Sequence, residues 1–165
     1  MKIISGGQTG VDRAALDVAI QRGIDWGGWC PKGGWAEDLP DPPGVLAQYA
    51  KLKETPLPNP VQRTEWNVRD SDATLIITNR EGMAVSIGTR RAHQWARQHG
   101  KPELVVDAED ANAAAHAAAW LRTQRRRFGP HMTLSIGGPR ESEAPGIHER
   151  AHLLIAAIFD RLSRD

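Results

Sequence analysis

The chain has 165 residues, with 21 basic and 20 acidic side chains and a formal net charge of +1. This balance argues against a general nucleic-acid surface, and the length fits one domain with a real core. A single cysteine excludes an intramolecular disulfide, and no apolar run reaches the span of a membrane. The polar start of the chain does not resemble a signal peptide. We therefore expect a single-domain cytoplasmic protein over residues 1–165, without membrane or nucleic-acid partners.

The N-terminal part of the chain predicts two strands around one helix. The expected elements are a strand over residues 2–5, a helix over 10–22 that ends at Gly23, and a strand over 24–29. Residues 30–60 carry most of the prolines and show no clear period. They predict a long irregular segment with a short helix at 44–52, and long loops of this kind are often functional.

The rest of the chain alternates regularly between helix and strand. Helices are expected over 60–70, 86–101, 109–127 and 146–163, and strands over 73–79, 102–107 and 131–138. Such alternation places parallel strands in one sheet with helices against it. The predicted fold class is α/β: a Rossmann-like, doubly wound, mostly parallel sheet with helices on both faces.

Three stretches place glycine, or glycine with a hydroxyl, between a predicted strand and a predicted helix. They are Gly6-Gly7-Gln8-Thr9-Gly10 (preceded by Ser5), Ser86-Ile87-Gly88-Thr89 and Gly137-Gly138-Pro139-Arg140. Such loops meet at the C-terminal edge of a parallel sheet, where backbone N–H groups and helix dipoles can hold an anion. The spacing matches neither G-x-G-x-x-G nor G-K-[ST], which disfavours a classical dinucleotide motif and excludes a P-loop. We predict a phosphate or oxyanion site.

Charged and polar side chains near the same edge complete the predicted site. Arg140 is a candidate anion clamp, and Arg63, Asn67 and Asp70 share one helical face. The residues predicted to bind the ligand are Ser5, Gly6, Gly7, Gln8, Thr9, Gly10, Asp12, Arg13, Lys32, Arg63, Asn67, Gly88, Thr89, Gly137, Gly138 and Arg140.

One motif suggests a metal. His148-Glu149-Arg150-Ala151-His152 matches H-E-x-x-H, the helix of zinc proteases. However, the match begins within two residues of Pro145-Gly146, no convincing third ligand follows, and His152 borders the apolar stripe of its helix. We therefore predict no metal site. Cys30 has no evident base partner, and we expect it to be buried.

Five segments together resemble the putative molybdenum carrier family, which is similar in turn to Rossmann proteins of the LOG and DprA type. They are "ISGGQTGVDRAALDVAI", "GGWCPKGGWAED", "QRTEWNVRDSDATLII", "GTRRA" and "SIGGPRESEAPGI", and they span almost the whole chain in order. LOG-type proteins cleave the N-glycosidic bond of nucleoside 5'-monophosphates and carry G-G-x-G-T-x-x-E. This chain departs from that motif, with Ser86 for the second glycine and Ala92 for the glutamate.

The resemblance implies three alternative functions and self-association. The first is binding of a phosphorylated nucleotide, of a pterin-type molybdenum cofactor, or of an oxyanion such as molybdate. The second is LOG-like phosphoribohydrolysis, which needs a carboxylate; Glu65 and Asp70 are the catalytic candidates, with Glu37 and Asp38 in reserve. The third is a nucleotide sensor that acts in trans. The family likeness also predicts a homo-oligomer.

Tryptophans 26, 29 and 35 cluster within ten residues. They either stack on a base or pterin ring or pack in the core or an interface.

Overall fold

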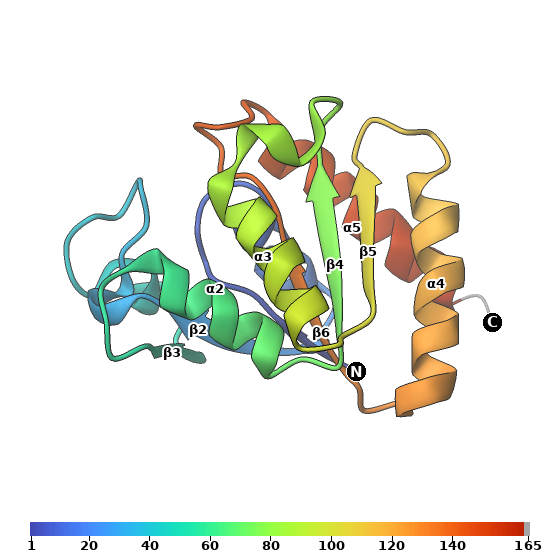
Figure 1. Ribbon diagram of the computed structural model, residues 1–165, viewed down its shortest axis with the longest axis horizontal. Helices are drawn as coiled ribbons and strands as arrows, with labels where there is room; N and C mark the ends of the chain where they lie inside the picture. Colours follow the sequence, from blue (N-terminus) through green and yellow to red (C-terminus); the bar gives the residue numbers. More distant parts are fainter. Residues whose placement is uncertain (164–165) are drawn as a thin grey trace.

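A computed structural model describes residues 1–163, which form one six-stranded parallel sheet with the strand order β3-β2-β1-β6-β4-β5 (Figure 1). The strands are β1 (Lys2–Ile4), β2 (Asp25–Cys30), β3 (Leu52–Glu54), β4 (Ala73–Thr78), β5 (Glu103–Asp107) and β6 (Thr133–Gly137). The last strand therefore lies between β1 and β4, near the middle of the sheet. All C-terminal strand ends lie at one edge, because the pairing is parallel.

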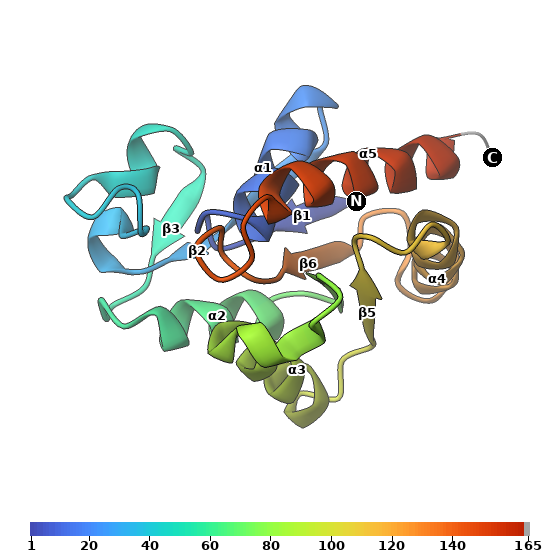
Figure 2. The same cartoon turned by 90° about the horizontal axis from the view of Figure 1, so that it is seen from above.

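Helices cover both faces of the sheet. They are α1 (Val11–Gln21), α2 (Pro60–Arg69), α3 (Ile87–Gln98), α4 (Ala113–Phe128) and α5 (Ile147–Ser163). Helices α1, α4 and α5 lie on one side, and α2 and α3 lie side by side on the other (Figure 2). The predicted Rossmann-like α/β fold is therefore confirmed. None of the helices within residues 1–163 is both long enough and apolar enough to cross a bilayer.

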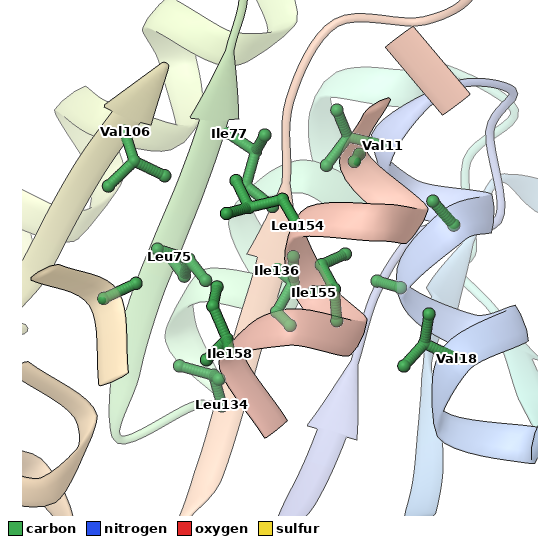
Figure 3. Packing of buried hydrophobic residues seen from close by; sticks show 14 of the residues in the cluster. Val11, Val18, Leu75, Ile77, Val106, Leu134, Ile136, Leu154, Ile155 and Ile158 are labelled. Carbon is green, nitrogen blue, oxygen red and sulfur yellow. The ribbon is translucent and has the colours of Figure 1, made fainter. Parts of the chain in front are cut away.

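The two faces of the central strands differ in polarity. Side chains alternate along a strand, so Leu75 and Ile77 of β4 point to the face covered by α1, α4 and α5. There they join a continuous apolar core with Ile136, Ile155 and others (Figure 3). On the opposite face lie Thr74 of β4 and Ser135 of β6, which are register partners. This face, under α2 and α3, is therefore partly polar.

The segment 30–60 is more ordered than its sequence predicts. It contains two 3-10 turns, η1 (Lys32–Gly34) and η2 (Gly44–Ala47), and then the edge strand β3. The helix expected over 44–52 is thus wrong beyond its first turn, and one strand was missed. Strand β3 has three residues, of which only the leucine is buried, so no periodicity could reveal it. A third 3-10 turn, η3 (Gly82–Val85), precedes α3.

The missed strand anchors a second, smaller core. Leu52 packs there with Val45, Leu16 and Cys30. The cysteine is fully buried, and this burial raises the pKa of its thiol to about 11. Its expected burial is confirmed, and at neutral pH it stays protonated.

Candidate functional site

A cavity of about 340 Å³ lies between the sheet and helices α2 and α3, toward the C-terminal ends of β1, β4 and β6. Thr74, Ile76 and Ser135 line it from the sheet, and Arg63 and Thr89 line it from the two helices. Its volume falls at the lower end of the range typical of small-molecule sites. It is also where ligands bind in open α/β sheets.

The structure brings the three glycine-containing loops together around this cavity. Gly6, Gly88 and Gly137, one from each loop, all line its wall. The predicted binding residues that line it are Ser5, Gly6, Gln8, Asp12, Arg63, Asn67, Gly88, Thr89, Gly137, Gly138 and Arg140. Segments that lie more than 130 residues apart in the chain thus share one hollow.

Two of the four glycines that line the cavity, Gly6 and Gly138, have no room for a side chain. A Cβ at Gly138 would lie 2.1 Å from the carbonyl oxygen of Ile77, and a Cβ at Gly6 would lie 2.2 Å from Nη1 of Arg63. At Gly88, by contrast, the nearest atom to a Cβ would be Oγ of Ser86, at 3.8 Å. Of these three lining glycines, only Gly88 has free space beside it.

The positive end of α1 is used within the protein. The backbone N–H of Val11 donates to the carbonyl oxygen of Pro139 at 3.2 Å, and the first turn carries the acidic Asp12. A carboxylate at this position already offsets the helix dipole. The loop 6–10 forms a wall of the cavity through Gly6 and Gln8, and the helix that follows it offers less uncompensated positive charge to an anion than its sequence position suggests.

The positive end of α3 is available. Ser86 caps this helix, and its Oγ accepts a hydrogen bond from the N–H of Thr89 at 3.2 Å. The first turn carries no acidic side chain, and the N–H groups of Ile87 and Gly88 precede any intrahelical acceptor. Both residues line the cavity. This end of α3 is thus suited to hold an anion.

A buried ion pair lines the same cavity as the α3 terminus. Nη1 of Arg63 donates to Oδ2 of Asp12 at 2.8 Å, and the two side chains are 14% and 6% exposed. Burial raises the pKa of Asp12, whereas the adjacent Arg63 favours its charged form. The pair joins α1 to α2 and fixes the guanidinium against the cavity.

Three buried polar atoms of the cavity have no hydrogen-bond partner within the described residues. They are Nε of Arg63, Oγ1 of Thr74 and Oγ1 of Thr89. Native proteins rarely leave such groups unpaired, because desolvation without a hydrogen bond is costly. All three residues line the cavity, but the three atoms themselves have almost no accessible surface. A ligand that drew these side chains toward the hollow and hydrogen-bonded to them would remove this cost.

Two more arginines lie around the cavity. Arg91 is exposed and forms no ion pair with any of residues 1–163, whereas Nε of Arg140 lies 3.4 Å from Glu37 and 3.7 Å from Glu143. Arg140, the predicted clamp, is therefore largely neutralised by carboxylates. Arg91 is the freer cation.

Some predicted binding residues lie elsewhere. Thr9, Gly10 and Arg13 line a neighbouring open hollow with Glu37 and Asp38. The Arg13 guanidinium hydrogen-bonds to Asp38, and this bond holds the pKa of that carboxyl below its usual value. This hollow is lined by acidic as well as basic groups, so it is a poorer anion site.

Gly7 and Lys32 are also outside the main cavity. A Cβ at Gly7 would lie 2.9 Å from Leu52, so this glycine faces the second core. Lys32 lines a third, proline-rich hollow that adjoins the main cavity.

Neither predicted catalytic carboxylate lines the cavity. Asp70 accepts hydrogen bonds from Nε of Arg69 at 2.7 Å and from Nε1 of Trp29 at 2.8 Å. The bond from Arg69, followed by that from Trp29, lowers the pKa of Asp70 despite partial burial. Glu65 lies 3.8 Å from Nε2 of His99. The carboxylates that do line the cavity are Asp12 and Glu143.

The two histidines of the H-E-x-x-H motif have different partners. Nε2 of His148 lies 3.1 Å from Asp17, and Nε2 of His152 lies 3.1 Å from Gln21. Their rings are 6.2 Å apart. Within residues 1–163, no three His, Cys, Asp or Glu side chains gather in a group that could hold a metal.

Several cavity residues escaped the sequence analysis. Thr74 and Ser135 are polar residues inside apolar strands, which is a signal that the sequence does carry. Arg91 and Glu143 gave no such signal, because only the tertiary fold brings them to the cavity. Trp35, one of the clustered tryptophans that the sequence offered either for ring stacking or for packing, also lines it.

These features define a Rossmann-like α/β protein with a small, cation-lined cavity at the C-terminal edge of a parallel sheet. The chain matches the circularly permutated YpsA SLOG family over residues 3–159, and it belongs to that family.

A solved structure supports the same assignment. The chain is similar to the crystal structure of a putative molybdenum carrier protein from Syntrophus aciditrophicus SB, with 39% sequence identity and a TM-score of 0.80. The match covers 95% of this chain and 93% of that one. The resemblance seen in the sequence is confirmed. No curated protein matches the chain.

Proposed function

We propose that the chain binds a small phosphorylated molecule in the main cavity, with a phosphate at the N-terminus of α3. The observation that carries this proposal is the set of unpartnered polar atoms on Arg63, Thr74 and Thr89 around one hollow. Phosphate oxygens accept hydrogen bonds from guanidinium N–H groups and from hydroxyls, the groups that these residues carry. The first-turn N–H groups of α3 supply further donors.

The electrostatics support an anionic ligand. Asp12 already balances Arg63, and Arg140 faces two carboxylates. The helix dipole of α3 and the unpaired Arg91 remain as uncompensated positive groups. Together they favour one compact negative group, held close to the helix end.

The size of the cavity favours a phosphorylated organic molecule over a bare oxyanion. About 340 Å³ exceeds what a single tetrahedral anion such as molybdate fills, and Trp35, Val61 and Ile76 give the remainder apolar walls. A nucleotide, or the phosphate end of a pterin-type molybdenum cofactor, combines a compact anionic group with an organic part that fits apolar walls. The name of the relative from Syntrophus aciditrophicus SB, a putative molybdenum carrier protein, is compatible with the second class.

The carboxylates support binding rather than N-glycosidic cleavage. Asp12 is held by Arg63, and Glu143 accepts a hydrogen bond from the backbone N–H of Arg140 at 3.2 Å. Each of these carboxylates is thus already engaged by a group of the protein, and Glu65 and Asp70 do not line the cavity. A carrier needs no such base.

The test is a ligand panel read by thermal unfolding and by calorimetry. The compounds are inorganic phosphate, molybdate, AMP, GMP and their nucleosides. We expect the monophosphates to stabilise the fold, by about 2.7 kcal/mol at 100 times their dissociation constant, and the nucleosides to have no effect. The proposal fails if no phosphate compound stabilises the protein. Release of free base from AMP or GMP would instead favour the phosphoribohydrolase.

A further inference from the structure

The proline-rich hollow that contains Lys32 adjoins the main cavity. It measures about 360 Å³ and is lined by Lys32, Gly33, Trp35, Pro40, Pro42, Pro58 and Pro60. Trp35 and Pro60 line both hollows. A ligand that extends past these two side chains has access to a total volume of roughly twice that of the main cavity.

The walls of this proline-rich hollow suit a flat ring. Four prolines and the half-buried Trp35 present rigid apolar surfaces, and an indole face stacks well on a heterocycle. The prolines have few conformations to lose on binding, which keeps the entropic cost low. Such a surface recognises an aromatic ring better than it recognises a phosphate.

Lys32 places one positive charge in the same hollow. Its side chain is exposed and forms no ion pair within the part of the chain that the structure describes. Two of the other lysines are engaged: Lys51 lies 3.2 Å from Asp25, and Lys101 donates to the carbonyl oxygen of Ser71 at 2.6 Å. Lys32 is therefore free to bind an anionic group of a ligand.

We propose that the two hollows form one extended site for a dinucleotide-type ligand, two ring systems joined through phosphates. This inference rests on the proposed function of the main cavity. One half, with its phosphate at α3, occupies the main cavity; the second ring lies against Trp35 in the proline-rich hollow, and Lys32 binds the second phosphate. The missing G-x-G-x-x-G is no obstacle, because the phosphates are bound by α3 and Lys32 and not by the loop 6–10.

The test compares the affinities of AMP and diadenosine diphosphate by calorimetry, and likewise those of GMP and diguanosine diphosphate. In the wild-type chain we expect the dinucleotide of at least one series to bind about tenfold more tightly than its mononucleotide. Lys32→Ala should remove this advantage and change the affinity for the mononucleotide less than about twofold. Lys53→Ala, an exposed lysine outside both hollows, is the matched control and should change neither affinity.

A second variant tests the ring. Trp35→Phe retains a flat face and should keep most of the advantage of the dinucleotide, whereas Trp35→Ala should lose it. Two outcomes would overturn the extended site: equal affinities for mononucleotide and dinucleotide in both series, or an equal loss of both affinities in Lys32→Ala. Neither outcome would contradict the proposed function of the main cavity. Absence of binding by every phosphate compound would refute the proposed function itself, and the extended site with it.

Discussion

Arg63 donates to Asp12 across 2.8 Å, and this buried ion pair joins the first turn of α1 to α2 directly over Gly6. The contact explains why position 6 has no side chain, and it leaves Nε of Arg63 without a protein partner. The pair therefore excludes a side chain at position 6 and leaves one N–H of Arg63 for a ligand. Removing either partner leaves an uncompensated charge in a buried place.

We expect Asp12→Asn to lower the free energy of unfolding by about 3 kcal/mol, because Arg63 loses its counter-charge. The same change should strengthen the binding of inorganic phosphate, since the anion then supplies the missing negative charge. Urea unfolding with and without phosphate measures both effects. The double variant Asp12→Asn/Arg63→Gln, which removes both charges, should recover much of the stability. A single variant as stable as the wild-type chain would contradict the role of the pair.

Thr89→Val should separate folding from binding. Its hydroxyl is buried without a partner, so the change should leave stability unaltered or raise it by about 1 kcal/mol. We expect phosphate affinity to fall about tenfold, the effect of one charge-assisted hydrogen bond. Ser86→Ala, the control at the same turn, removes the cap of α3 and should cost about 1 kcal/mol of stability. Unchanged phosphate affinity in Thr89→Val would place the anion elsewhere.

Gly88→Ala and Gly138→Ala should behave in opposite ways. A methyl group at Gly88 meets no atom closer than 3.8 Å and lies in a helix, so the fold should gain about 0.5–1 kcal/mol while ligand affinity falls. At Gly138 it would overlap the carbonyl oxygen of Ile77 and cost about 3 kcal/mol or more. Thermal unfolding and phosphate titration of both variants check this. Equal stability of the two would show that the backbone near β6 adapts more than its packing suggests.

Arg91→Ala should weaken phosphate binding more than Arg140→Ala does. The first guanidinium is unpaired at the cavity, whereas the second is already shared between Glu37 and Glu143. We expect a loss of about fivefold for Arg91, and this loss should shrink at high salt because the side chain is exposed. Neither change should unfold the protein. Arg97→Ala, in the last turn of the same helix, is the control, and a similar loss there would reduce the role of Arg91 to general charge.

Glu37→Gln should make the stability of the protein less sensitive to acid pH. Burial disfavours the charged form of Glu37, but hydrogen bonds donated by Ser142 and Thr9 outweigh it and lower its pKa. A carboxyl whose pKa falls on folding stabilises the protein above its unfolded pKa of about 4.3, and this contribution is lost as the pH falls through the folded value. The variant should melt earlier at pH 7 and lose less on acidification. If the melting temperatures of the variant and of the wild-type chain fell by the same amount from pH 7 to pH 3, the prediction would be wrong.

The sequence predicted most of the architecture. Alternating helix and strand patterns were sufficient for the parallel sheet, because apolar runs such as "ATLIIT" of β4 must be buried on both faces. It also predicted that the loops with Gly6, Gly88 and Gly137 meet, since parallel pairing sends all C-terminal ends to one edge. It failed at β3, where three residues are too few to show a period.

What the sequence could not determine is which groups at that edge are already used. The loop motifs and their place between strand and helix predicted that Gly6, Arg140 and the start of α1 serve a ligand. In the structure Gly6 packs against Arg63, Arg140 faces two carboxylates, and the first N–H of α1 donates to Pro139. Only the tertiary structure shows that Thr74, Thr89 and Nε of Arg63 remain unpaired around one hollow. The physical reason is that a motif fixes local backbone geometry, whereas hydrogen-bond satisfaction depends on neighbours that are distant in the chain.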